Sequence, residues 1–180
     1  MDSPFMNTIA RGLADRQIRV VRFEFPYMER RRDDGKRRPP DGHAKLRERW
    51  LEVVGELGHV GDLVIGGKSM GGRIASMIAD EIGVRGLVCL GYPFHPVGKP
   101  DRLRVAHLET IRTPTLILQG TRDALGNRAE IDGYALSRNV RVEFLEDGDH
   151  SFKPRVRSGR TEEENLRQAI DSVATFVERI

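Results

Sequence analysis

Residues 62–71, DLVIGGKSMG, form the stretch that decides the fold. The run DLVIG at 62–66 has the short apolar character of a buried strand, and Gly67-Lys68-Ser69-Met70-Gly71 follows it directly. The apolar spacing from about residue 70 to 82 then predicts a helix. The serine therefore occupies the turn from strand to helix. The glycines two positions either side of it are expected to leave room where the two backbones crowd together.

The pentapeptide fits G-x-S-x-G, and its setting between a strand and a helix is the one that a nucleophile elbow requires. Such a turn points the Ser69 hydroxyl out at the carboxyl end of the sheet, where open α/β sheets place their sites. It also puts the backbone N–H of Met70 at the start of a helix, as one donor for a developing oxyanion. Two alternatives are a glycine-rich turn with an incidental serine and a phosphate-binding loop. The second lacks a glycine where Asp62 stands.

Outward from this turn, strand-like and helix-like segments alternate along the chain. That alternation predicts the α/β class, with a mostly parallel sheet, helices on both of its faces, and one domain over residues 1–180. Strands are predicted at 19–25, 62–66, 86–91, 114–119 and 140–145, helices at 4–17, 43–57, 70–82, 127–137 and 161–179, and loops at 29–42 and 92–100.

Two further turns follow predicted strands and carry the groups that would activate a serine. Asp123 lies in GTRD after the strand at 114–119, and His150 lies in EDGDH after the strand at 140–145. A serine hydroxyl needs a base to take its proton, and a carboxylate that orients the imidazole improves that base. The chain order Ser69, Asp123, His150 is the one expected for this kind of sheet. We therefore predict a catalytic triad of these three residues.

The remaining histidines and nearby acids are weaker candidates for the triad. None of the other histidines follows the last strand, although His95 could line the pocket, and His107 is expected to pack on a helical face. The acids beside His150 are expected to shape its loop. These competitors are His43, His59, His95, His107, Asp147 and Asp149.

Composition excludes several other classes of protein. Cys89 is the only cysteine, so an internal disulfide cannot form, and no His/Asp/Glu cluster has metal-ligand spacing; we expect no metal and no cofactor. No apolar run is long enough to span a bilayer, and the start lacks the features of a signal peptide, which predicts a cytoplasmic protein without a membrane partner. The basic runs at 30–38 and 153–160 lack interleaved aromatics, so they are read as solvated loops rather than a nucleic-acid site.

Seven segments together resemble one known family: MDSPFMNTIA, RVVRFEFPYM, KRRPP, GGKSMGGRIAS, GYPFHPVGKP, LQGTRDALG and GDHSFKPRVRSGRT. The chain is similar to the small bacterial α/β-family hydrolases distantly related to dienelactone hydrolase. It also resembles the hydrolase-like domain of a subunit of a mammalian histone-acetyltransferase complex. The resemblance implies the α/β-hydrolase fold and the roles of Ser69, Asp123 and His150. It implies no particular substrate, and in the mammalian relatives it implies a non-enzymatic role.

The resemblance also implies a strand before MDSPFM that ends in a His-Gly-Ala-Gly-type loop and lies between the strands at 19–25 and 62–66. The loop would supply the second oxyanion donor. Because the sequence starts at Met1 of MDSPFM, we expect an N-terminally truncated hydrolase fold. Either the start codon is misassigned or the truncation is genuine. We favour the first, since losing a central strand would leave unpaired backbone groups on both neighbours.

Two functions remain open from the sequence. The first is a serine hydrolase acting on a small-molecule carboxylic ester, thioester or related acyl compound, with little or no lid over a shallow pocket. The second is a non-catalytic α/β-hydrolase-like interaction module, which the basic loops and the mammalian resemblance motivate. The oligomeric state is not predicted.

Overall fold

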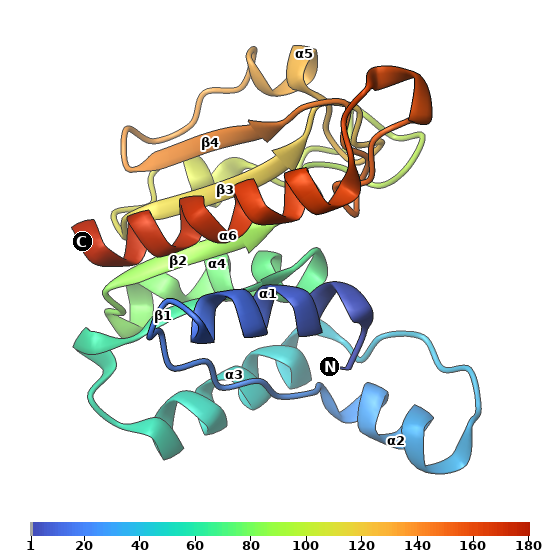
Figure 1. Cartoon of the computed structure of the whole chain (residues 1–180). Helices are drawn as coiled ribbons and strands as arrows, with labels where there is room; N and C mark the ends of the chain where they lie inside the picture. Colours follow the sequence, from blue (N-terminus) through green and yellow to red (C-terminus); the bar gives the residue numbers. More distant parts are fainter. Residues whose placement is uncertain (1) are drawn as a thin grey trace.

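Four parallel strands form the sheet of the protein, in a computed structural model that describes residues 2–180 (Figure 1). The strands are β1 (Val64–Lys68), β2 (Gly86–Leu90), β3 (Thr115–Gly120) and β4 (Val140–Leu145), in the order β1-β2-β3-β4. The register pairs Gly67 with Cys89 and Cys89 with Ile117. Because the strands are parallel, their carboxyl ends meet at one edge, and the turns that carry Ser69, Asp123 and His150 all leave the sheet there.

Helices cover both faces of the sheet, as the alternating pattern predicted. Helices α3 (His43–Leu57) and α4 (Met70–Ile82) lie on one face, and α1 (Pro4–Ala14) and α6 (Glu162–Arg179) on the other (Figure 1). Side chains of β2 point alternately to the two faces of the sheet. Leu87 and Cys89 join the core under α3 and α4, whereas Val88 and Leu90 join the core under α1 and α6. All four side chains are buried, so β2 is an apolar run on both faces.

The prediction of a strand at residues 19–25 is wrong. The structure assigns no strand to this segment, and β1 is an edge strand within the described residues. Only its two phenylalanines pack into the core, whereas Val20 and Val21 are exposed. Phe23 meets Phe25 and Trp50 edge-to-face, with ring centroids 5.7 and 4.7 Å apart. The two phenylalanines therefore join the core beside α3 without a hydrogen-bonded ladder.

The prediction of a loop over 29–42 is also wrong in part, because α2 spans Pro26–Asp34. Pro26 opens this helix, and Gly35 ends it in the left-handed conformation with φ 67°. Two other elements are shorter than expected: α1 ends at Ala14, and α5 covers only Arg128–Ile131.

Short 3-10 turns complete the fold at η1 (Val60–Asp62), η2 (Ala106–Glu109) and η3 (Val156–Ser158). The last helix begins with a capping box, in which Thr161 and Glu164 bond to each other's backbone N–H groups. Within residues 2–180, no helix combines the length and the hydropathy needed to span a membrane.

Candidate active site

Ser69 lies at the junction of β1 and α4 in a strained backbone conformation, with φ 53° and ψ −117°. A non-glycine residue adopts such angles at a cost of order 1–3 kcal/mol, and only where the surrounding structure enforces them. Here the Ser69 N–H is held by the carbonyl of Leu90 on β2, at 3.0 Å. Met70, the first residue of α4, has an N–H that helix geometry does not use. This is the geometry of a nucleophile elbow.

Close backbone approach at the elbow requires two glycines, and one of them differs from the prediction. A Cβ on Gly67 would lie 2.9 Å from backbone atoms of α4, and a Cβ on Gly72 would lie 2.6 Å from the Gly67 carbonyl oxygen. A Cβ on Gly71 would meet nothing within 4 Å. The crowding thus involves Gly67 and Gly72, because α4 turns its Gly72 side toward β1 and β2.

The structure brings the three predicted triad residues into one hydrogen-bonded chain. His150 Nε2 lies 2.9 Å from Ser69 Oγ, and His150 Nδ1 lies 2.7 Å from Asp123 Oδ2. A carboxylate only accepts hydrogen bonds, so Nδ1 carries the proton and Nε2 is left to accept from the serine hydroxyl. The Asp123 side chain has no solvent exposure, whereas that of His150 is 30% exposed. The buried end of the chain is the acid, and the reactive end faces outward.

Asp123 is fixed by two donors besides His150. Its Oδ2 also accepts from Gln119 Nε2 at 2.8 Å, and its Oδ1 accepts from the N–H of Leu125 at 2.9 Å. Gln119 is itself fully buried, and its amide also bonds to the backbone N–H and carbonyl of Tyr92. Sequence reasoning missed Gln119; the available signal was an amide side chain at the end of the apolar strand PTLILQ.

Lys68 is a second residue that sequence reasoning missed in this role. Its ammonium donates to the His150 backbone carbonyl at 2.6 Å and lies over the Phe5 ring, 5.6 Å from the centroid. Burial lowers the pKa of Lys68 to about 8, against the opposing effect of nearby Asp123 and Asp149. Lys68, at the end of β1, thus links this strand to the loop that carries His150.

The acids beside His150 shape its turn, as expected. Asp147, at φ 52°, accepts hydrogen bonds from the backbone and side chain of Arg155 and also pairs with Arg122. The bonds from Arg155 are the main reason that the pKa of Asp147 is lowered to about 2. Asp149 accepts from the N–H groups of Ser151 and Lys153. Both carboxylates are therefore already engaged by donors around the turn.

The other histidines lie outside the hydrogen-bonded chain. The His95 side chain is 4% exposed, and its ring contacts the Pro96 carbonyl and Glu130. His43 and His59 are exposed, and His107 lies on η2 against Ser76 of α4, at 2.8 Å. No group of three His, Cys, Asp or Glu within residues 2–180 is arranged to hold a metal ion.

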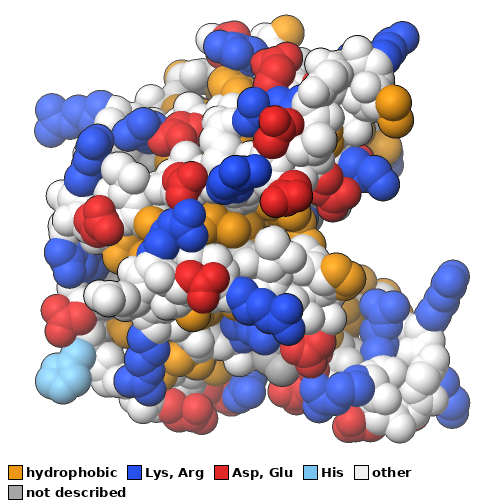
Figure 2. Space-filling view, in the orientation of Figure 1, with side chains coloured by type: hydrophobic (Ala, Val, Ile, Leu, Met, Phe, Trp, Pro, Cys, Tyr) orange, Lys and Arg blue, Asp and Glu red, His pale blue; other side chains and the backbone are white. Residues whose placement is uncertain are grey.

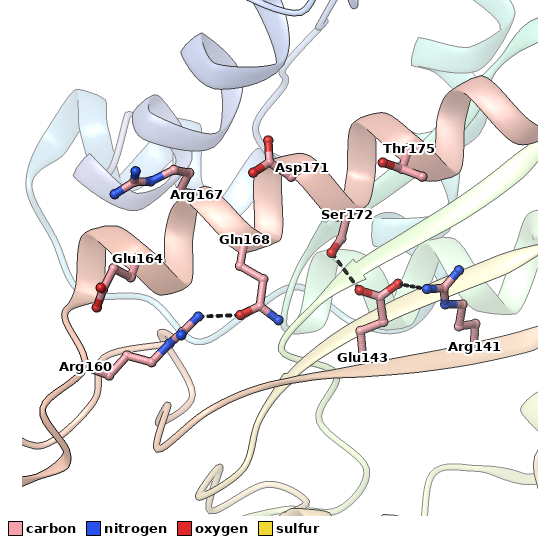
Figure 3. Close-up of a pocket in the computed structure, with 9 residues that line it drawn as sticks. All are labelled: Arg141, Glu143, Arg160, Glu164, Arg167, Gln168, Asp171, Ser172 and Thr175. Atoms are coloured by element: carbon pink, nitrogen blue, oxygen red, sulfur yellow. Dashed lines mark hydrogen bonds and ion pairs between the residues drawn. The ribbon is translucent and has the colours of Figure 1, made fainter.

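A hollow marks the edge of the sheet where these loops meet. Figure 2 shows a deep indentation on the side toward which the strand arrows of Figure 1 point, with apolar side chains in its walls. A separate groove of about 510 Å³ lies between β4 and α6 (Figure 3). Glu143 in its lining already bonds to Arg141 and Ser172, and no triad residue lines it. We therefore place the candidate site at the first hollow.

A comparison with protein families identifies the family of the chain. A family model described as an alpha/beta hydrolase domain matches residues 1–178. The chain belongs to this family. The α/β-hydrolase domain also resembles solved structures over nearly its whole length, each at under 25% identity, which supports the fold alone.

Three of these structures illustrate the likeness. An alpha-beta serine hydrolase homologue from Coxiella burnetii has 18% identity and a TM-score of 0.70, over 97% of this chain and 76% of that one. The esterase domain of a Rhodothermus marinus protein has 18% identity and a TM-score of 0.66, over 97% and 79%. An alpha/beta-superfamily hydrolase from Xanthomonas campestris pv. campestris has 21% identity and a TM-score of 0.63, over 95% and 91%.

The family and the fold of the α/β-hydrolase domain support a hydrolase. The expected relationships to dienelactone hydrolase and to the histone-acetyltransferase complex subunit stay predictions, as does a cytoplasmic location.

Proposed function

We propose that this protein is a serine hydrolase that cleaves a small carboxylic ester, thioester or related acyl compound through an acyl-enzyme. The observation that carries the proposal is the chain from Ser69 Oγ to His150 Nε2 and from His150 Nδ1 to Asp123 Oδ2, at 2.9 and 2.7 Å. Both distances lie within hydrogen-bond reach, which is the requirement for a base that activates a nucleophile.

In the first half of the reaction, Ser69 Oγ attacks the substrate carbonyl carbon while His150 Nε2 takes the hydroxyl proton. The carbonyl oxygen gains negative charge, which the N–H of Met70 stabilises. When the tetrahedral intermediate collapses, the bond to the leaving group breaks, and His150 returns its proton to that group. The acyl group is left on Ser69.

In the second half, water attacks the acyl carbon and His150 Nε2 takes one of its protons. The second intermediate releases the carboxylic acid, and His150 reprotonates Ser69 Oγ. Throughout, Asp123 holds the imidazole tautomer and stabilises its charged form without becoming protonated.

The test is hydrolysis of 4-nitrophenyl acetate and butyrate by the wild type and matched variants. Ser69→Ala and His150→Ala should each lower kcat by about 10³-fold or more, because removing any member of a triad leaves little catalysis beyond binding and oxyanion stabilisation. The controls are Ser151→Ala and His59→Ala, which alter an exposed serine and an exposed histidine. Both controls should retain wild-type rates.

Activity that survives in Ser69→Ala would refute the proposal. So would the absence of ester hydrolysis in a wild-type protein shown by circular dichroism to be folded. That second result would favour the non-catalytic interaction module.

A further inference from the structure

Among the half-buried arginines of residues 2–180, two bond to neither a carboxylate nor a side-chain amide, and one of these lies a helical turn from the nucleophile. Arg73 lies one helical turn after Ser69 in α4, and Arg104 lies in the loop between β2 and β3. Neither forms an ion pair within residues 2–180. The other half-buried arginines there bond to carboxylates or side-chain amides: Arg22, Arg38, Arg49, Arg122 and Arg160. Within the described part of the chain, these two charges are therefore not compensated by a carboxylate.

A buried polar cluster fixes the backbone at both arginines. Ser76 Oγ donates to the Arg73 carbonyl at 2.7 Å, and Tyr92 Oη donates to the Arg104 carbonyl at 2.9 Å. With both hydroxyl hydrogens used in this way, His107 Nε2–H is the donor to Ser76 Oγ at 2.8 Å and to Tyr92 Oη at 3.3 Å. Three side chains therefore hold α4 and the loop after β2 in one arrangement.

Arg73 lies close enough to Arg104 and His107 for its charge to affect both groups. Burial, and then the charge of Arg73, lower the pKa of Arg104, and the same two causes lower the pKa of His107. The Arg73 Nε atom is buried and has no hydrogen-bond partner among the described residues, while its Nη1 donates to His43 Nε2 at 3.1 Å. A buried donor without an acceptor is unfavourable, and an anionic ligand could supply the missing acceptor.

The amino terminus of α3 adds positive potential at the same place. His43 is the first residue of this helix, and Gly42 at its N-cap supplies no side-chain acceptor for the first N–H groups. Unpaired N–H groups and the helix dipole favour a negative charge at such an end. Through His43, this end lies next to Arg73. The Arg73 guanidinium thus lies at this helix end, and Arg104 lies within range of its charge.

We propose that Arg73 and Arg104, with the amino terminus of α3, bind a compact anionic group of the substrate, so that the protein acts on esters that carry a carboxylate. This inference rests on the proposed function and deepens it. One helical turn, about 5.4 Å, separates Arg73 from Ser69 along α4, a span comparable to a four-methylene chain. A guanidinium fork matches the two oxygens of a carboxylate.

The test compares 4-nitrophenyl hydrogen adipate with the neutral 4-nitrophenyl hexanoate. The wild type should favour the carboxylate ester at least tenfold in kcat/KM, since hydrogen bonds to a charged group contribute about 1.5–3 kcal/mol. Arg73→Gln and Arg104→Gln should each reduce that ratio about tenfold. Arg102→Gln removes the same charge from an exposed position of the same loop and should retain the ratio. Circular dichroism checks that each variant is folded.

A second readout does not require turnover. Adipate should raise the Tm of Ser69→Ala, and the shift should disappear in Ser69→Ala/Arg73→Gln and shrink at high salt. A wild type that cleaves both esters equally well, with no Tm shift by adipate, would overturn the inference while leaving the serine hydrolase intact. Full activity in Ser69→Ala would instead overturn the proposed function. A Tm shift by adipate that depends on Arg73 would in that case still support an anion-binding site.

Discussion

Replacing Asp123 by Asn tests the hydrogen bonds that the structure assigns to this side chain. The carboxylate accepts from three donors: His150 Nδ1 and Gln119 Nε2 at Oδ2, and the Leu125 N–H at Oδ1. An asparagine has one accepting oxygen and one donating NH₂ group. Because the Asp123 side chain has no solvent exposure, water cannot readily replace a lost hydrogen-bond partner.

The two orientations of the amide differ in cost. With its NH₂ group toward Gln119 and His150, the variant would oppose one donor with another and force the proton of His150 onto Nε2. With its oxygen in that place, it keeps both of those bonds and loses only the bond from Leu125. The surroundings therefore favour the second orientation, in which His150 keeps the productive tautomer.

In that orientation the loss is one of charge. The imidazolium that forms in the transition state faces a neutral oxygen rather than a carboxylate, which we expect to cost about 1.5–3 kcal/mol. At about 1.4 kcal/mol per tenfold in rate, kcat should fall about 10- to 150-fold. An inverted tautomer would lower it about 10⁴-fold. The unpaired Leu125 N–H should also lower the unfolding free energy by about 1–3 kcal/mol.

The assay is kcat for 4-nitrophenyl acetate under saturating substrate, with urea denaturation for stability. Asp132→Asn, an exposed change of the same kind, is the control and should match the wild type. Unchanged kcat in Asp123→Asn would refute the role of Asp123. A fall near 10⁴-fold would refute the reasoning that Gln119 selects the orientation of the amide.

Two other predictions concern the elbow and its neighbour. Gly72→Ala should lower the unfolding free energy by about 1–3 kcal/mol, because its Cβ would meet the Gly67 carbonyl oxygen at 2.6 Å. Gly71→Ala, in open space on the same helix, should leave the unfolding free energy unchanged or raise it by up to about 1 kcal/mol. Equal urea midpoints for the two variants would contradict this. For Lys68, with a pKa of about 8 in the folded protein and an ordinary value of 10.5, the unfolded chain binds the extra proton between those values. Between pH 7 and 9.5, the unfolding free energy of the wild type should therefore rise by about 2 kcal/mol relative to that of Lys68→Met, as measured by urea unfolding. A difference in unfolding free energy that stays constant with pH would count against a buried ammonium.

Elements with strong local signals could be predicted closely from the sequence. The helix at 43–57 has the predicted bounds, because an apolar stripe runs through it and glycines flank both ends. By contrast, RVVRFEF alternates like a strand, yet a strand also needs a hydrogen-bonded neighbour, which local sequence does not encode. Helix α2 was missed because its charged residues have no apolar period. Its signals were Pro26 at the start and Gly35 at the end.

For the candidate site, chain order and the turns after strands were enough to select Ser69, Asp123 and His150. The residues that hold them could not be selected in this way. Gln119 and Lys68 act through buried contacts made across the sheet edge, which depend on how the loops after β1, β3 and β4 meet in space. A polar residue in an apolar strand is the one sequence signal that pointed to such a contact.

The most direct test of the account is the mass of the protein after reaction with a fluorophosphonate, followed by mapping of the labelled peptide. One phosphonate per chain should be found, attached to Ser69, with labelling abolished in Ser69→Ala and slowed strongly in His150→Ala. A folded protein that takes up no label, or carries it on a serine other than Ser69, would contradict the account.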